Sequence, residues 1–331
     1  MDTPNWKKEG DSQTSPLENK QRKEVEIKKP LRENVIFVGS EMNYDSFWLK
    51  MMFIAASYRI AKHNQLFRTA DKTTLAYVDN GYVRFEKLTL DYLAQNHNCK
   101  IQKITKQADI ATLLNEDREN HKLQDVAFFS HGIVGKISLN YDGATAIDFD
   151  EKLMKSVSST AFTRDGRLFS YACRTGVSVE DWKRGFNNES EAAPQNSLAQ
   201  KLADHFDIEV HAYLRRTFYG DVLRAKAQSA GIASTLKSTR DTRKDDTLIV
   251  DLPPEHEALP HPGLADNGST GIFGYFERGA IGEGTDNYAL WRKQGGRVFP
   301  TAADSPKGLP TDMRRFVSAK RAKAEAEAKK K

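Results

Sequence analysis

Two short apolar runs, each ending in one reactive side chain, constrain the fold of this chain more than any other feature. The first covers residues 125–132, Asp-Val-Ala-Phe-Phe-Ser-His-Gly, and delivers His131. The second covers residues 167–176, Arg-Leu-Phe-Ser-Tyr-Ala-Cys-Arg-Thr-Gly, and delivers Cys173. Continuous apolar runs of this length are typical of strands buried in a parallel sheet. Because the carboxyl ends of parallel strands meet at one edge of such a sheet, we expect the imidazole and the thiol to lie together there.

The segments around these runs alternate between strand and helix patterns. Further strands are expected at residues 34–40, 74–79, 100–105 and 208–214, and helices at residues 47–62, 88–95, 108–115, 150–156 and 197–206. Strands that alternate with helices indicate a parallel sheet with right-handed crossovers. We therefore predict an α/β fold of three layers, with a mostly parallel central sheet flanked by helices.

A hairpin is expected between the two apolar runs. Residues 136–140 and 146–149 have the pattern of extended segments, and Tyr141-Asp142-Gly143 lies between them. Asp-Gly between two extended segments is a strong signal for a tight turn. The sequence therefore predicts a pair of antiparallel strands after His131.

Composition divides the chain into one central domain with polar ends. Residues 1–33 carry almost no apolar side chains, so a charged flexible arm is expected there. We place the main domain at 34–235, an irregular C-terminal extension packed on it at 236–317, and a basic tail at 318–331. Of all 331 residues, 39% are hydrophobic, which is enough to bury a sizeable core.

Targeting signals and membrane segments are not expected. No apolar run approaches the roughly 18 residues that a membrane span requires, and the N-terminus lacks the apolar stretch of a secretory signal. The chain has two cysteines, Cys99 and Cys173, which fits a reducing compartment better than a disulfide framework. We therefore expect a cytoplasmic protein, with export by a signal-peptide-independent secretion system as an open alternative.

No cofactor, metal or nucleic-acid partner is expected. The sequence has no CxxC and no Cys/His cluster of the kind that binds zinc. The acids at Asp148, Asp150 and Glu151 have the pattern of a calcium site or of a helix start, and we favour the helix start because acids suit a helix N-terminus. The net charge of +5 is concentrated in the two ends, which we interpret as solvated.

The two reactive residues form a plausible nucleophile and base. A thiol is a poor nucleophile until it becomes a thiolate, so Cys173 needs a base or a positive neighbour, and His131 can supply both. An attacked carbonyl also needs donors for its oxyanion. We expect these donors to be the backbone N–H groups of Gly132 and Cys173, since a side chain at position 132 would obstruct the substrate carbonyl.

The ordered set of Ser130-His131-Gly132, the Asp-Gly hairpin and residues 169–176 resembles the caspase-like cysteine peptidases. This family includes caspases, metacaspases, gingipain-like enzymes, separase-like enzymes and the self-processing domains of some bacterial toxins. The close resemblance covers about 50 residues, and each motif alone is common, whereas the order of all three is fairly specific. The resemblance implies that Cys173 is the nucleophile, that His131 is the general base and acid, and that Gly132 contributes to the oxyanion hole.

The implied activity is cleavage of peptide bonds in a protein or peptide substrate by a cysteine endopeptidase. Self-processing in the polar loop at residues 177–196, control by a regulatory or inhibitory protein partner, and deployment as a bacterial effector toxin are compatible with the resemblance. The alternative is a caspase-like scaffold or interaction protein without catalysis, in which Cys173 is an ordinary buried cysteine. A basic protein that binds nucleic acid through its ends is a further rival, and it predicts affinity that falls steeply with salt.

Two departures from the family pattern prevent an inference about cleavage after aspartate. Tyr171 stands where caspases that cleave after acids carry a glutamine that helps to hold the substrate, and Thr175 separates Arg174 from Gly176, which are adjacent in caspases. Aspartate specificity is therefore not implied by the resemblance.

The residues after the strand at 208–214 are the candidates for substrate recognition. Arg215 or Arg216 would favour an acidic side chain at P1, because guanidinium pairs well with carboxylate. Asp221 would select a basic side chain instead. We favour an arginine and keep the choice open.

Overall fold

The structure is a computed structural model, and it describes residues 29–42, 52–57, 60–61, 66–82, 84–180, 185–219, 222 and 299–330. The strands are β1 (Leu31–Val38), β2 (Lys72–Val78), β3 (Lys100–Ile104), β4 (His121–Phe129), β5 (His131–Ile133), β6 (Lys136–Ser138), β7 (Asp148–Asp150), β8 (Phe162–Ser170), β9 (Glu209–Ala212), β10 (Thr217–Phe218), β11 (Thr301–Ala302) and β12 (Arg314–Phe316). The helices are α2 (Arg84–Asn96), α3 (Gln107–Asn115), α4 (Glu151–Met154), α5 (Leu198–Phe206) and α10 (Ala319–Ala328), with 3₁₀ turns η1 (Glu189–Ala192) and η2 (Pro194–Asn196). Residues 52–57 and 60–61 are also helical.

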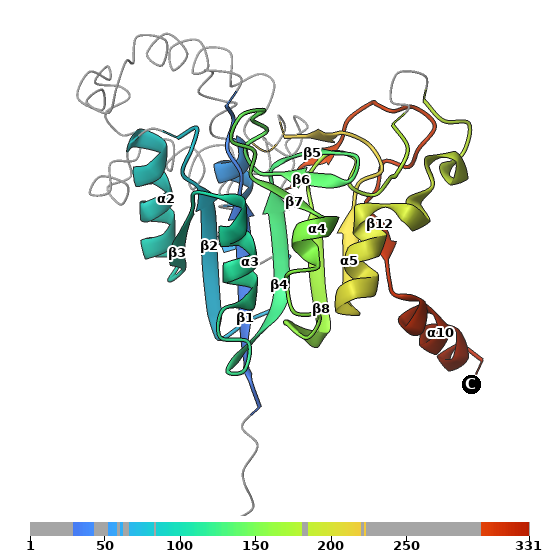
Figure 1. The fold of residues 1–331 in the computed structure, drawn as a ribbon, viewed down its shortest axis with the longest axis horizontal. Coiled ribbons are helices and arrows are strands. Elements are labelled where there is room, and N and C mark those ends of the chain that lie inside the picture. The colour runs from blue at the N-terminus through green and yellow to red at the C-terminus, as the bar shows by residue number, and fades with distance from the viewer. Residues whose placement is uncertain are drawn as a thin grey trace, which may run out of the picture.

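A seven-stranded sheet in the order β12-β9-β8-β4-β1-β2-β3 forms the centre of the molecule (Figure 1). All neighbouring strands are parallel except β12, which runs antiparallel to β9. The chain builds outward from β1 through β2 and β3, and then crosses back to add β4, β8 and β9 on the other side of β1. The direction of growth therefore reverses between β1 and β4, and the carboxyl ends of strands at such a reversal are the usual place for a ligand site in α/β sheets.

Helices cover both faces of the sheet, and the alternation of side chains along β1 shows how. Val35 and Phe37 pack into one cluster with apolar residues of α3 and α5, whereas Ile36 and Val38 pack into the other with residues 52–57 and with α2. Successive side chains of a strand point to opposite faces, so a continuous apolar run fills both cores. Figure 1 shows α3, α4 and α5 on one face of the sheet. The predicted mixed α/β fold with a mostly parallel central sheet flanked by helices is thus confirmed.

Several strands begin earlier than the apolar pattern predicts. β1 begins at Leu31 rather than at residue 34, and β4 begins at His121 rather than at residue 126. Most of the added residues are polar, and the two buried acids among them, Glu33 and Asp125, are paired with cations. Glu33 is buried, with its carboxylate 2.9 Å from Nη1 of Arg118 and 3.0 Å from Nζ of Lys72. Hydropathy alone cannot recognise such residues as strand, because their partners are distant in sequence.

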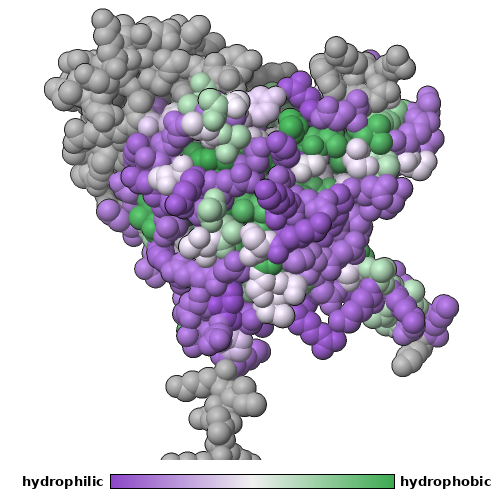
Figure 2. Space-filling view, in the orientation of Figure 1, coloured by the Kyte–Doolittle hydropathy of each residue, from purple (hydrophilic) through white to green (hydrophobic). Residues whose placement is uncertain are grey.

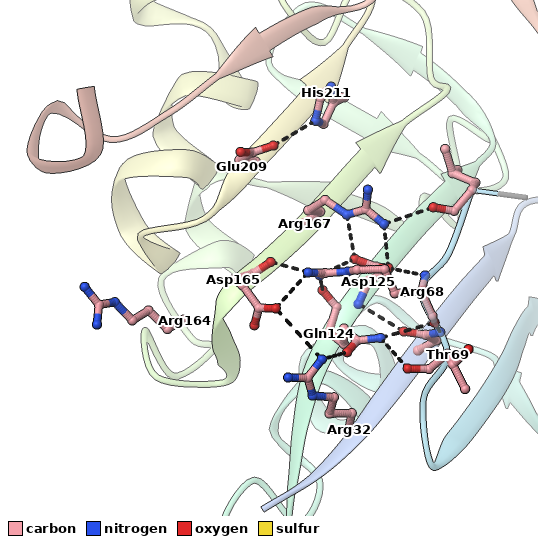
Figure 3. Close-up of polar contacts among 12 residues, drawn as sticks. Arg32, Arg68, Thr69, Gln124, Asp125, Arg164, Asp165, Arg167, Glu209 and His211 are labelled. Carbon is pink, nitrogen blue, oxygen red and sulfur yellow. Dashed lines mark hydrogen bonds and ion pairs between the residues drawn. The ribbon is translucent and has the colours of Figure 1, made fainter. Parts of the chain in front are cut away.

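The largest of these polar networks centres on Asp125 of β4, which is fully buried (Figure 3). Its carboxylate lies 2.7 Å from Nη2 of Arg68 and 2.8 Å from Nη2 of Arg167 on β8. Arg68 also reaches Asp165 through Nη1 at 2.8 Å. Two cations therefore compensate one buried carboxylate, and the network ties β4 to β8 and to the segment before β2.

The small sheet after β4 has the antiparallel pairing expected of a hairpin. β6 pairs with β7, with Ile137 opposite Phe149, and β5 pairs with β6 on the other side. Asp150 caps α4, since its side chain accepts a hydrogen bond from the backbone N–H of Leu153. Asp150 and Glu151 thus start a helix, as expected, whereas Asp148 lies in β7 and pairs with Lys136.

The C-terminal part of the chain contributes to the main sheet. β12 adds an antiparallel edge strand to β9, so residues 314–316 are part of the sheet of the main domain rather than of a separate extension. Most of the extension predicted at residues 236–317, up to residue 298, lies outside the described residues. α10 is helical, as the Ala/Lys/Glu pattern indicates, and begins after Ser318, whose side chain accepts a hydrogen bond from the N–H of Arg321. None of the helices in the described part of the chain combines the length and apolarity needed to cross a lipid bilayer.

Candidate functional site

The ends of β4 and β8 lie next to each other at the carboxyl edge of the sheet. The strands are parallel neighbours, with Phe128 opposite Ser170, and the N–H of Tyr171 donates to the carbonyl of Phe128 at 3.0 Å. Beyond these positions the chain continues to His131 on one side and to Cys173 on the other. The two segments that the apolar runs single out therefore meet at one edge, because the buried strands that carry them pair in register.

Gly132 lies directly against the backbone of Cys173. A Cβ atom at position 132 would come within 2.8 Å of both the N and O atoms of Cys173, and within 2.7 Å of the Cβ of Ala172. Real Cβ atoms do not approach other atoms so closely, so only glycine fits here. Among the described residues, no backbone carbonyl accepts the N–H of Cys173.

A buried carboxylate holds the imidazole. Oε2 of Glu41 lies 2.8 Å from Nε2 of His131, and Glu41 is only 1% exposed. Gly39 allows the turn that carries Glu41 to pack against the hairpin. A Cβ atom at position 39 would lie 2.5 Å from the carbonyl oxygen of Leu139, so a side chain does not fit there. A carboxylate on Nε2 keeps the proton on that nitrogen, which leaves Nδ1 as the proton acceptor.

Aromatic rings fix the imidazole further. The ring of Phe53 meets that of His131 edge-on at 5.0 Å between centroids, and the ring of Tyr141 lies at 5.2 Å. The histidine side chain itself is 22% exposed. It is therefore positioned by its surroundings and still open to solvent.

The sulfur is held by the segment that follows β9. The backbone N–H of Thr217 donates to Sγ of Cys173 at 3.2 Å, and the N–H of Arg174 donates to the carbonyl of Arg215 at 2.9 Å. Tyr219 anchors the same segment, since its hydroxyl donates to the carbonyl of Tyr171 at 3.0 Å. Burial raises the pKa of Tyr219 well above its ordinary value, so this hydroxyl stays protonated and donates.

The structure describes three of the four residues predicted to bind substrate: Tyr171, Arg215 and Arg216. Tyr171 is 3% exposed and its ring stacks on that of Phe129, so its side chain is part of the core rather than of an open pocket. Arg215 donates from Nε to the carbonyl of Leu309 at 2.6 Å, and Arg216 is exposed. Asp221 lies outside the described residues.

Apolar side chains are exposed around this edge of the sheet. Among the described residues, the large hydrophobic side chains with the greatest exposure are Tyr141, Val179 and Phe218, together with Leu31 at the start of β1. Tyr141 follows the hairpin strand β6, Val179 follows the Cys173 loop, and Phe218 is next to Thr217. Figure 2 shows a mainly hydrophilic surface, with small separate groups of hydrophobic residues near its upper edge and its middle.

Glu41 is the residue of the candidate site that sequence reasoning missed. It stands two residues after Gly39, and 90 positions separate it from His131. The only available signal was an acid just beyond the end of a buried strand. That signal becomes informative once β1 is known to be the neighbour of β4.

The second cysteine is not equivalent to the first. Burial raises the pKa of the Cys99 thiol to about 11, and its Sγ lies 3.5 Å from the backbone carbonyl of His97 rather than bonding the imidazole. The described residues contain no group of three or more His, Cys, Asp or Glu side chains placed to hold a metal ion. The groups at this edge of the sheet are a thiol, an imidazole, a buried carboxylate and backbone amides.

Comparison with known proteins gave no match to this chain among family models, curated proteins or solved structures.

Proposed function

We propose that the protein is a cysteine endopeptidase of the caspase-like kind, with Cys173 as nucleophile and His131 as base. The observation that carries this proposal is the contact of Gly132 with the backbone of Cys173 at the paired ends of β4 and β8. This contact supports the proposal because the residues next to it carry a thiol and an imidazole at one edge of the sheet. These are the parts that acyl transfer through a thioester requires.

In the first half of the reaction, Nδ1 of His131 takes the thiol proton and Sγ attacks the carbonyl carbon of the scissile bond. The negative charge that develops on the carbonyl oxygen is stabilised by the N–H groups of Cys173 and Gly132. The imidazolium then gives its proton to the leaving nitrogen as the C–N bond breaks. The new N-terminus departs, and the acyl group remains on sulfur as a thioester.

In the second half, a water molecule attacks the thioester carbonyl while the imidazole takes one of its protons. The C–S bond breaks and the thiolate regains a proton. Glu41 does not react: it keeps Nε2 protonated and stabilises the imidazolium at each stage. Its role follows from the 2.8 Å contact to His131 and from its burial, which strengthens the interaction.

The surrounding architecture supports a peptide as the substrate. A mostly parallel sheet with an antiparallel edge strand, and a small hairpin directly after the histidine, match the arrangement that the sequence resemblance implies. The exposed ring of Tyr141 lies beside that of His131, and the exposed Phe218 follows Thr217, whose N–H contacts the thiol sulfur. An extended peptide could contact these side chains with residues that flank the scissile bond.

The test compares the purified wild-type protein with Cys173→Ala and His131→Ala on a mixed peptide library and on itself. Each substitution should abolish cleavage, while Cys99→Ala should cleave like wild type. Fragments identified by mass spectrometry would also show whether the chain cuts its own loop at 177–196. Absence of cleavage in all four proteins, with no labelling of Cys173 by peptide electrophiles, would favour the non-catalytic scaffold instead.

A further inference from the structure

Tyr141, in the loop between β6 and β7, has a backbone conformation that suits few residues. Its φ is 47°, in the left-handed region where a Cβ atom lies too close to the following carbonyl oxygen. Three of the six described non-glycine residues with a positive φ are Asn or Asp, which tolerate this region, and Tyr141 is the only aromatic residue among the six. A strained position of this kind persists only where the surrounding structure fixes it, and such positions gather at functional sites.

The loop around Tyr141 contains the hydrogen bonds that fix this conformation. Asn140 is fully buried, donates from Nδ2 to the carbonyl of Thr145 at 2.7 Å and accepts the N–H of Ile147 at 2.9 Å. The carboxylate of Asp142 accepts the N–H of Thr145 at 3.1 Å. The residues on both sides of Tyr141 are thus tied to the far end of the loop, so its backbone can relax only if these hydrogen bonds break.

Packing in the core does not account for this tyrosine. Tyr141 is 47% exposed, whereas each of the other five tyrosines in the described part of the chain is at most 7% exposed. The centroid of its ring lies 5.2 Å from that of His131, and the two rings are tilted by 37°. Phe53 meets the same imidazole edge-on, and Glu41 contacts its Nε2. The imidazole therefore contacts two aromatic rings as well as a carboxylate.

We propose that Tyr141 is a positioning residue for His131, and that its ring stabilises the positive charge that the imidazole gains when it takes the thiol proton. This inference rests on the proposed protease function and adds a residue to its machinery. An aromatic ring attracts a cation that lies within about 6 Å of its centroid, and the distance of 5.2 Å between the two rings is inside that range. The attraction comes from the ring, so the hydroxyl of Tyr141 is not needed for this role.

The experiment compares wild type with Tyr141→Phe, Tyr141→Gly and Ala193→Gly in steady-state cleavage of a peptide that wild type cleaves. Tyr141→Gly should lower kcat about tenfold, the scale of one cation–π contact, and should change KM less than about twofold. Tyr141→Phe keeps the ring and should keep the wild-type kcat. Ala193→Gly is the matched control and should also keep it, since Ala193 has a positive φ of 44° but lies between η1 and η2. Glycine suits a positive φ, so urea unfolding should show that both glycine variants are folded under the assay conditions.

The outcomes separate this inference from the protease proposal. A wild-type kcat in Tyr141→Gly, a loss confined to KM, or an equal loss of kcat in Tyr141→Phe would overturn the inference and leave the protease in place. Should wild type cleave no peptide, modification by diethyl pyrocarbonate still tests the contact, because this reagent reacts with the neutral, accessible imidazole.

The internal reference for this modification is His121, which also contacts a carboxylate and whose side chain is 23% exposed, against 22% for His131. Relative to His121, His131 should react several-fold faster in Tyr141→Gly than in wild type, while Tyr141→Phe should react like wild type. Faster reaction would support the positioning role in a protein without catalysis. An unchanged ratio of the two rates would refute it.

Discussion

The imidazole of His131 and the carboxylate of Glu41 meet at 2.8 Å although they leave the sheet from different strands. Glu41 follows β1 and His131 follows β4, and these strands are neighbours at the point where the direction of sheet growth reverses. The pair joins a buried anion to a ring that is still 22% exposed. The contact with Glu41 orients the imidazole of His131 and leaves part of it exposed to solvent.

Glu41→Gln should lower kcat about 100-fold or more, because the amide can donate to Nε2 and so favour the wrong tautomer of His131. KM should change little, since Glu41 does not contact the substrate. Steady-state kinetics on a peptide cleaved by wild type would separate these parameters. Glu180→Gln, at an exposed position after the Cys173 loop, is the matched control. A change in KM alone, or an equal loss in the control, would contradict the positioning role.

Gly132→Ala should abolish cleavage, because the new methyl group would come within 2.8 Å of the N and O atoms of Cys173. Relief of this overlap requires the ends of β4 and β8 to separate, at a cost of about 1–3 kcal/mol in the free energy of unfolding. Denaturant unfolding and peptide cleavage would measure the two effects. Gly143→Ala, where a Cβ would have no neighbour within 4 Å, should leave both unchanged. Full activity of Gly132→Ala would rule out the proposed oxyanion site.

Alkylation should distinguish the two thiols. Burial raises the pKa of Cys99 to about 11, so at pH 7 this thiol is almost fully protonated and unreactive. Iodoacetamide should therefore label Cys173 first, and labelling of Cys99 should rise as the pH approaches 11. Peptide mass spectrometry after timed quenching would give both rates. Faster labelling of Cys99 at neutral pH would count against the assignment of Cys173.

Asp125→Asn should destabilise the fold by about 3 kcal/mol, because it leaves Arg68 and Arg167 without their shared anion. Burial by itself would raise the pKa of Asp125, but hydrogen bonds from Arg167 and Arg68 outweigh it and hold the pKa below its usual 3.8. The stabilisation is therefore complete above about pH 4 and is lost as the pH falls through the lower pKa of the folded state.

Urea unfolding of wild type and of Asp125→Asn between pH 7 and pH 3 would test this dependence. The difference between the two proteins should be largest at neutral pH and should shrink in acid. Asp165→Asn removes the more exposed acid of the same network (53% exposed side chain) and should cost less than about 1 kcal/mol. A constant difference across this pH range would show that Asp125 is not the titrating group.

Local pattern was sufficient for most of the sheet and for two residues of the candidate site. The apolar runs before His131 and Cys173 predicted adjacent parallel strands, and β4 and β8 pair as expected. The Asp-Gly turn predicted the antiparallel hairpin. Each of these signals comes from residues close together in the chain, where periodicity and turn chemistry act directly.

The polar halves of the strands and the edge strand β12 were not predictable in this way. Glu33 and Asp125 occupy strand positions because arginines from distant segments neutralise them. β12 has only three residues, two of them arginines, and it is a strand because β9 offers an open edge. The surroundings of Tyr171 also depend on contacts between segments that are distant in sequence. Its side chain is buried in the core, which the residues next to it in the chain do not indicate.

The amino-acid order by itself determined which segments form buried strands and that His131 and Cys173 would end two of them, because strand formation follows from apolar runs and turn residues along a short stretch of chain. Only the tertiary structure decided that Glu41 contacts the imidazole and that Thr217 contacts the sulfur. These relationships depend on which strands become neighbours and on what each charge finds nearby after folding, and both are properties of the packed molecule rather than of any local sequence.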